Sequence, residues 1–166
     1  MQIPKLVHRK NSKKLTVELI PTTVRSKSLF QIYTKNRCLD VWTEIKDELL
    51  EREGKKCWIC GKKSMHLFVH EFWEYDDDKS LMKLQEIHHL CNKCHKIKRT
   101  DFWFFTDYGK EQLKKLDISP EDLIKHYCKV NKCDLKDFGQ NWREAVDLWK
   151  TRSEQEWIQD YGEFLQ

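Results

Sequence analysis

The sequence predicts a small α+β protein of one domain (1–166), in which a metal site joins two strands and a helix and further helices flank this core on both sides. Three observations support this prediction. Two Cys-x-x-Cys pairs lie thirty residues apart, strand-like segments fill the interval, and helical periodicity occurs outside it. A chain of 166 residues is long enough for one compact core.

The two cysteine pairs have the spacing of a structural zinc site. A Cys-x-x-Cys turn brings two thiolates to one ion, and two such turns complete a closed tetrahedral site. The predicted zinc ligands are Cys57, Cys60, Cys91 and Cys94. The remaining cysteines have no flanking partner, and we expect Cys38, Cys128 and Cys133 to be buried free thiols.

The N-terminal part of the chain gives the weakest pattern. Residues 1–37 contain Pro4 and Pro21 as breakers and one short alternating run at 15–19, so we expect an irregular or β-like segment. Apolar residues then recur at helical spacing over 39–52, which predicts a helix that ends at Gly54.

The segment between the cysteine pairs predicts a hairpin. Residues 65–73 are rich in β-branched and aromatic types, residues 76–80 are typical of a turn, and residues 81–90 return as a second strand. The second cysteine pair then opens a helix that reaches about Arg99. Residues 57–99 therefore form a predicted ββα unit that zinc fixes at both ends.

Residues 119–165 predict C-terminal helices. Ser119 and Pro120 are a helix start, and this helix continues to about Lys132. A last helix is expected from about Asn141. We expect its apolar positions to pack on the core rather than stack on bases: Trp142, Val146, Trp149, Trp157, Ile158 and Tyr161.

The net charge of +4 is unevenly distributed. Residues 1–63 carry 15 Lys or Arg against 7 Asp or Glu, whereas residues 64–166 carry 16 against 20. A basic cluster around the second cysteine pair, which includes Lys96, Lys98 and Arg99, suits a phosphate backbone. The longest apolar run is too short to span a bilayer and no signal-peptide core is visible, so we expect a cytoplasmic protein with no membrane partner.

Three residues of the ββα unit could carry chemistry. His70 and Glu71 lie on the first strand and face opposite sides of it, and His95 lies in the first turn of the helix. Hydrolysis of a phosphodiester needs a base that activates water and a cation that stabilises the transition state. If zinc holds strand and helix together, these side chains could converge on a second ion.

These motifs resemble the zinc-bearing HNH endonucleases, also called His-Me finger or ββα-metal nucleases. The resemblance covers Cys57-x-x-Cys60, the His70 strand and Leu90-Cys91-x-x-Cys94-His95-x-x-Lys98. A second resemblance, to a small group of bacterial HNH-type proteins, is carried by His70-Glu71-Phe72-Trp73-Glu74-Tyr75-Asp76 and by Trp149-Lys150-Thr151-Arg152-Ser153 followed by Trp157.

The resemblance implies a metal-dependent endonuclease that hydrolyses DNA phosphodiester bonds. By position, His70 and His95 would hold a catalytic divalent ion such as Mg²⁺, and Glu71 stands where the family has its histidine base. Lys98 would contact phosphate, with Lys96 and Arg99 beside it.

Several alternatives stay open at the level of sequence. His70 is the base and Glu71 turns to the metal, or Glu71 itself accepts the proton, although its ordinary pKa of about 4.3 makes it a weaker base than imidazole. Alternatively, the protein is a catalytically inactive zinc module that binds nucleic acid, or a zinc domain that binds other proteins. RNA is an alternative substrate to DNA, and the sequence predicts no oligomeric state.

Overall fold

The computed structural model describes residues 14–165. In chain order its elements are η1 (Thr22–Val24), α1 (Leu29–Lys35), α2 (Leu39–Glu53), β1 (Phe68–Asp76), β2 (Leu81–Leu90), α3 (Asn92–Lys98), α4 (Thr100–Phe105), α5 (Asp107–Lys115), α6 (Pro120–Asn131), α7 (Leu135–Arg152), β3 (Ile158–Asp160) and η2 (Gly162–Leu165). The chain is therefore a mixed α+β protein, as the sequence predicts.

A long hairpin forms the middle of the molecule. β1 and β2 are antiparallel, with Phe68 opposite Leu90 and Asp76 opposite Leu81. The register shifts between Phe72 and Trp73, so the hairpin bends there as a β-bulge does. β3 pairs in parallel with β2 and completes a three-stranded sheet of order β1-β2-β3.

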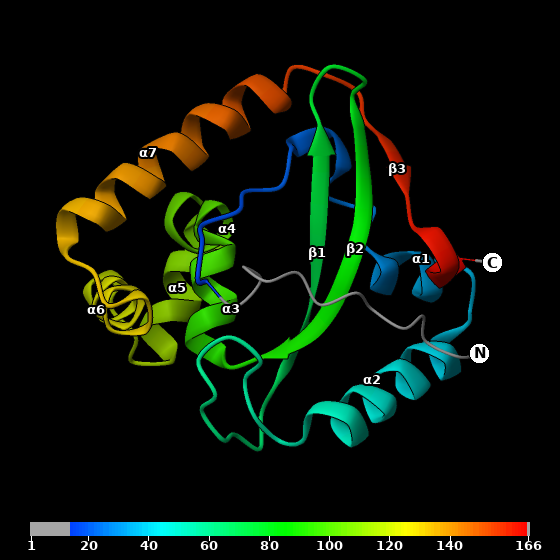
Figure 1. The fold of residues 1–166 in the computed structure, drawn as a ribbon, viewed down its shortest axis with the longest axis horizontal. Coiled ribbons are helices and arrows are strands. Elements are labelled where there is room, and N and C mark those ends of the chain that lie inside the picture. Colours follow the sequence, from blue (N-terminus) through cyan, green and yellow to red (C-terminus); the bar gives the residue numbers. More distant parts are fainter. Residues whose placement is uncertain (1–13, 166) are drawn as a thin grey trace.

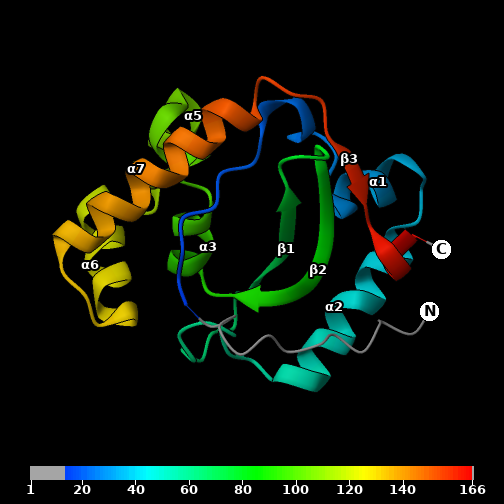
Figure 2. The same ribbon diagram turned by 45° about the horizontal axis from the view of Figure 1, so that its top comes forward.

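Helices cover the hairpin on both sides. Figures 1 and 2 show α3 to α7 on one side, and α1 and α2 on the other. The first side holds the larger apolar cluster, in which Leu90 and Ile97 are fully buried beside Leu123 of α6. The second holds a smaller cluster that includes Leu29, Leu49 and Ile87. The hairpin thus separates two cores, and each strand face has its own partners.

The first strand-like run of the chain is extended but forms no strand. Residues 15–19 alternate in burial, with Leu15, Val17 and Leu19 in the core. Their backbone amides bond to side chains instead of a neighbouring strand: Leu15 N donates to Asn131 Oδ1 at 3.1 Å and Val17 N donates to Asn141 Oδ1 at 3.0 Å. Because α6 and α7 supply these acceptors, the alternating burial of residues 15–19 marks an extended segment that packs on helices rather than a strand of a sheet.

The expectation that residues 1–37 are irregular or β-like needs a correction. Residues 1–13 lie outside the described part of the chain, and residues 29–35 form the helix α1 rather than an irregular segment. Ser28 caps α1 through a capping box with Gln31. This signature is present in the sequence, but a helix of 7 residues gives too little periodicity to be detected.

The hairpin and the helix that follows agree with the prediction. The helix at 39–52 extends to residue 53, the second strand spans 81–90, and the second cysteine pair opens α3, with Cys91 as its N-cap and Cys94 inside it. β1 begins three residues later than expected. The sequence did not predict α4 and α5, which contain an unbroken aromatic run and a glycine.

The C-terminal helices are confirmed in part. α6 starts at Pro120 as expected, but the last helix begins at Leu135, capped by Asp134, and ends at Arg152. Trp157, Ile158 and Tyr161 therefore do not belong to a helix: Trp157 precedes β3, and Tyr161 follows it. Trp142, Val146 and Trp149 pack on the larger core as predicted. Among the described residues, no helix is long and apolar enough to cross a membrane.

Candidate functional site

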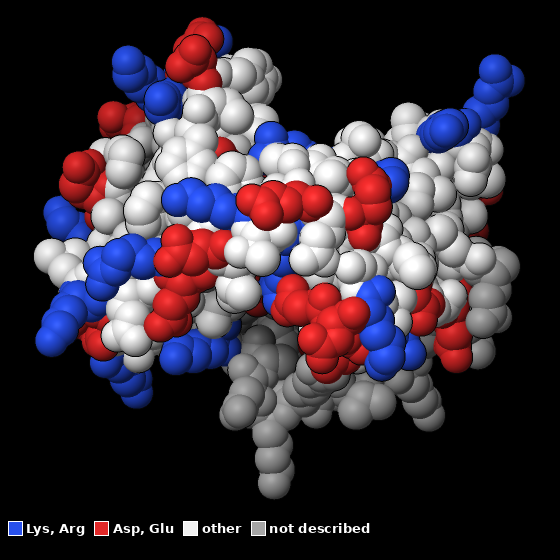
Figure 3. Space-filling view, turned by 90° about the horizontal axis from the view of Figure 1, so that it is seen from above, with Lys and Arg blue, Asp and Glu red and all other residues white. Residues whose placement is uncertain are grey.

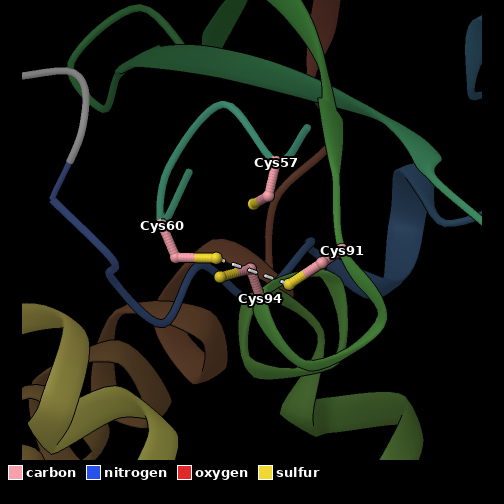
Figure 4. A group of neighbouring side chains, drawn as sticks. All are labelled: Cys57, Cys60, Cys91 and Cys94. Carbon is pink, nitrogen blue, oxygen red and sulfur yellow. Dashed lines mark hydrogen bonds between the residues drawn. The ribbon is translucent and has the colours of Figure 1, made fainter. Parts of the chain in front are cut away.

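The four predicted zinc ligands converge on one point. Their sulfur atoms lie within 4.8 Å of one another, and they are the only group of three or more metal-binding side chains in residues 14–165. Figure 4 shows two sulfurs arriving from the loop before β1 and two from the end of β2 and the start of α3. Four cysteines in this arrangement could hold an ion such as zinc.

The crowding of the sulfurs fits a cation between them. Hydrogen bonds with the Cys57 and Cys91 sulfurs, and then burial, raise the pKa of the Cys94 thiol far above its ordinary value, and repulsion from neighbouring thiolates adds to the effect. Cys60 Sγ and Cys91 Sγ are 3.7 Å apart. A bound divalent cation would stabilise four thiolates in this space. Among the described cysteines, none forms a disulfide, and Cys38, Cys128 and Cys133 are half-buried thiols.

His126 is a site residue that the sequence did not reveal. Its Nε2 lies 3.2 Å from Cys94 Sγ and so connects α6 to the cysteine cluster. A histidine that contacts a ligating sulfur from outside can orient the ligand and tune the metal. His126 lies on a separate helix, more than thirty residues beyond the cysteines, so only the packing of α6 on α3 reveals its role.

The hairpin and α3 bring His70 and His95 together. The two imidazole rings are perpendicular, with centroids 5.6 Å apart, and Phe68 stacks on His95 at 5.1 Å. Burial, and then the charges of His95 and Lys98, lower the pKa of His70. Burial, and then Arg99, lower the pKa of His95 to about 4. Both rings are therefore neutral at neutral pH.

Glu71 faces the other side of β1. Its Oε1 accepts a hydrogen bond from the Leu29 amide at 2.8 Å, and its Oε2 accepts one from Trp73 Nε1 at 3.2 Å. Burial nevertheless raises the pKa of Glu71 to about 7, because the loss of water outweighs both hydrogen bonds and the attraction of Arg99. Such a carboxylate is a far better base at neutral pH than an exposed one.

Glu71 and His95 line one cavity of about 470 Å³. Three cationic side chains share this cavity, namely Arg25, Lys27 and Arg99. The pocket thus combines a carboxylate of raised pKa with an imidazole and several positive charges, which is a composition suited to an anionic substrate that reacts with water.

A buried aspartate holds two of these cations in place. Asp101 is only 1% exposed, and its carboxylate accepts bonds from Arg25 Nη2 and Arg99 Nε, each at 3.3 Å. Because Asp101 lies at the start of α4 and Arg25 just after η1, the contact joins distant parts of the chain at the cavity. Sequence reasoning missed Arg25 and Asp101 because no local pattern marks them.

The predicted site for a catalytic ion is incomplete. His70, Glu71 and His95 do not form a group of ligand atoms within 4.8 Å, since the cysteines are the only such group among the described residues. His70 faces His95, whereas Glu71 turns to the opposite side of the strand. Mg²⁺ takes oxygen ligands, usually one or two carboxylates together with water and substrate phosphates, whereas the facing pair here consists of two imidazoles. The described residues therefore give the expected Mg²⁺ site no support.

Two of the three predicted phosphate contacts are buried. Lys98 is 1% exposed and its Nζ donates to Glu18 Oε1 at 2.7 Å and to Thr16 Oγ1 at 2.9 Å. Lys96 is also buried, donates to Asn92, and lies 4.0 Å from the ring centroid of Trp103. In this arrangement both ammonium groups act inside the protein, and only Arg99 lines a cavity.

Other cations are better placed for a phosphate backbone. A cavity of about 870 Å³ beside the cysteines is lined by Lys62, Lys93, Lys125 and Lys129. A separate observation concerns the face shown in Figure 3, where Lys and Arg alternate with Asp and Glu, without a large area of one sign. An anion would therefore be attracted to individual side chains of that face and not to the face as a whole.

His88 belongs to the core rather than to a site. Its ring stacks on Trp58 at 3.7 Å, and its nitrogens lie 2.5 Å from Glu53 Oε1 and 3.2 Å from Glu86 Oε2. Burial alone would raise the pKa of Glu53, but the hydrogen bond with His88 holds it below its ordinary value. This buried network joins the end of α2 to β2.

Known proteins add no further identification. A scan against family models gives no match, and searches of curated proteins and of solved structures give no significant match. The HNH resemblance therefore rests on the motifs themselves.

Proposed function

We propose that this protein is an HNH-type endonuclease that hydrolyses phosphodiester bonds of DNA. The observation that carries the proposal is the cavity that brings Glu71 together with His95 and the arginine pair Arg25 and Arg99. The order of a strand hairpin and a helix next to four clustered cysteines also supports it, because the family resemblance is built on that order.

The proposed step uses this chain's own groups. Water attacks phosphorus, its oxygen forms the new P–O bond, and its proton passes to the Glu71 carboxylate. The bond from phosphorus to the departing sugar oxygen breaks, and that oxygen takes a proton from bulk water. Arg25 and Arg99 stabilise the extra negative charge of the transition state, as fixed cations do in phosphoryl transfer.

Of the alternatives that the sequence left open, the structure favours Glu71 as the base. Glu71 lines the cavity, whereas His70 is buried and faces away from Glu71 toward His95. His70 then serves to position His95. No step is assigned to a second metal ion, because the described residues do not supply its ligands.

A cleavage assay tests this proposal. Supercoiled plasmid and, separately, circular single-stranded DNA are incubated with the zinc-loaded protein in Mg²⁺, in Mn²⁺, or in a buffer without added divalent ion. We expect Glu71→Gln to slow nicking by about 10² to 10⁴-fold, as removal of a general base does. His95→Ala should also slow it. Glu74→Gln, which changes an exposed carboxylate of the same strand, is the matched control and should leave the rate unchanged.

The outcome that contradicts the proposal is equal nicking by the wild type, Glu71→Gln and His95→Ala, since this would identify a contaminating nuclease. Activity only in Mg²⁺ or Mn²⁺ would show that substrate supplies the ligands that the protein lacks. Equal activity without added ion would show that Glu71 and the arginines suffice.

A zinc module that binds nucleic acid without cutting it is the second candidate. It is favoured by the separation of Glu71 from His70, which leaves no three-ligand catalytic ion site among the described residues. This function predicts salt-sensitive DNA binding with no cleavage under any ion.

A further inference from the structure

The cavity that holds Glu71 has aromatic walls. Phe30 from α1, Trp73 from β1, and Phe102 and Trp103 from α4 line it together with the arginines. Aromatic faces beside cationic groups are the two features that proteins use for single-stranded nucleic acid, because bases stack on the rings and phosphates bind the cations. The composition of these walls therefore favours a single-stranded nucleic acid as the ligand of the cavity.

Phe30 is the most open of these rings. It is 47% exposed and leans on Trp42 with ring centroids 5.5 Å apart. Trp103 is less available, since the Lys96 ammonium already lies 4.0 Å from its ring centroid. Phe30 is thus the side chain on which a base would stack.

Two side-chain amides that line the cavity can form hydrogen bonds with the edge of a base. Gln31 uses its Oε1 to accept from Ser28, and Gln159 uses its Nε2 to donate to the Lys27 carbonyl at 3.3 Å. Among their contacts with described residues, this leaves the amide nitrogen of Gln31 as a donor and the amide oxygen of Gln159 as an acceptor. Such a pair suits the mixed donors and acceptors of a nucleobase.

The size of the cavity limits what can enter. About 470 Å³ lies within the range of sites for single small molecules. A base in an intact duplex is paired and stacked on both sides, so it reaches a concave pocket only after it leaves the helix.

We propose that this cavity binds one unpaired nucleotide, with its base on Phe30 and its phosphate toward Arg25 and Arg99. The inference rests on the proposed function and specifies its substrate: single-stranded DNA, or a base without a partner, rather than continuous duplex. The phosphate then lies beside Glu71, where the attacking water is activated.

A binding measurement tests this inference independently of the proposed hydrolysis. In the Glu71→Gln background and without divalent ions, fluorescence anisotropy is measured with a labelled single strand, the same sequence as duplex, and a duplex with one unpaired base. We expect the single strand and the interrupted duplex to bind more tightly than the intact duplex.

The stacking residue has a matched control on another helix. Phe30→Ala should weaken binding of the single strand roughly 5- to 150-fold, the range for loss of one base–aromatic stack, and Phe30→Trp should retain it. Phe105→Ala removes a ring of nearly equal exposure, 45% against 47%, that does not line the cavity, and it should bind as the parent does.

Two results overturn the inference: equal affinity of Phe30→Ala and the parent, or tightest binding to the intact duplex. If Phe30→Ala loses binding while the wild type cuts no DNA, the nucleotide site stands and the hydrolase proposal fails. If the wild type cuts DNA while Phe30→Ala binds and cuts normally, the hydrolase stands and the nucleotide site fails.

Discussion

At the scale of single residues, the two candidate site residues of β1 lie on opposite faces of the strand. His70 and Glu71 are neighbours in the sequence, but the pleat sends His70 to α3 and Glu71 to α1. The pattern of the sequence predicts this division, since adjacent strand residues face opposite ways. It does not predict that burial raises the pKa of Glu71 to about 7, because the burial comes from helices elsewhere in the chain.

This raised pKa has opposite effects on activity and on stability. If Glu71 is the base, as we propose, its ionised form is the active one and kcat/KM should rise with pH through about 7. The free energy of unfolding should change the other way: the stability that Glu71 contributes is fully present below its ordinary pKa and is lost as pH rises through about 7. Glu71→Gln should remove both dependences.

Other groups around Glu71 must be separated from it in this measurement. Arg99 lowers the Glu71 pKa, and Glu71 in turn raises the pKa of Tyr33 and Tyr161 after burial has done so. His95 titrates near 4 and the tyrosines far above neutrality, so neither gives a transition at 7. A rate profile without a rise near pH 7, or one that persists in Glu71→Gln, would contradict the assignment of Glu71.

At the scale of elements, the corner between α4 and α5 fixes the aromatic wall of the cavity. Gly109 is buried there, and its amide donates to the Thr106 side chain at 2.9 Å. A Cβ at this position would lie 2.9 Å from Trp103 Cα and closer still to the Phe102 carbonyl oxygen. The backbone of α4 thus leaves no room for a side chain.

Gly109→Ala should therefore destabilise the protein although alanine is the better helix former. We expect a loss of about 1–3 kcal/mol in the free energy of unfolding, as overpacking produces. Gly139→Ala in α7 is the control, since its Cβ would meet only the end of the flexible Arg143 side chain. That change should be neutral or add up to about 1 kcal/mol. Urea unfolding of both variants measures the difference, and equal stabilities would refute the packing argument.

At the scale of the whole molecule, the cysteine cluster joins the loop before β1, the end of β2, and α3, while His126 links it to α6. An ion bound there would cross-link the protein beside the larger core, to which α3 contributes Cys94 and Ile97. Structural zinc sites contribute folding free energy of about 10–16 kcal/mol in small domains, which is as large as the whole stability of an ordinary domain.

Removal of the metal should consequently unfold this protein. We expect one zinc per chain by elemental analysis, and loss of the cooperative thermal transition when a strong chelator is added or when Cys94 is changed to Ser. Cys38→Ser alters a half-buried cysteine outside the cluster and should keep both the zinc and the transition. A fully folded Cys94→Ser protein without metal would show that the cysteines are not a structural site.

Local patterns were sufficient for the elements that carry their own signals. The helix at residues 39–53, the strand at 81–90 and the start of α6 follow from periodicity, turns and caps that a few neighbouring residues define. The last helix was misplaced because Trp157 and Tyr161 extend an apolar pattern whose side chains pack on the sheet instead, Trp157 against Tyr75 and Tyr161 against Trp73.

The sequence by itself determined the cysteine cluster, since the geometry of a Cys-x-x-Cys turn is local and two such turns can share one ion. It also determined that His70 and Glu71 point apart. Only the tertiary structure decided that Glu71 lines a cavity together with His95. The reason is physical: burial raises the pKa of Glu71, and this burial depends on segments that approach the hairpin only when the chain is folded. Leu29, which bonds Glu71, and Arg25, which lines the cavity, both lie far from β1 in sequence.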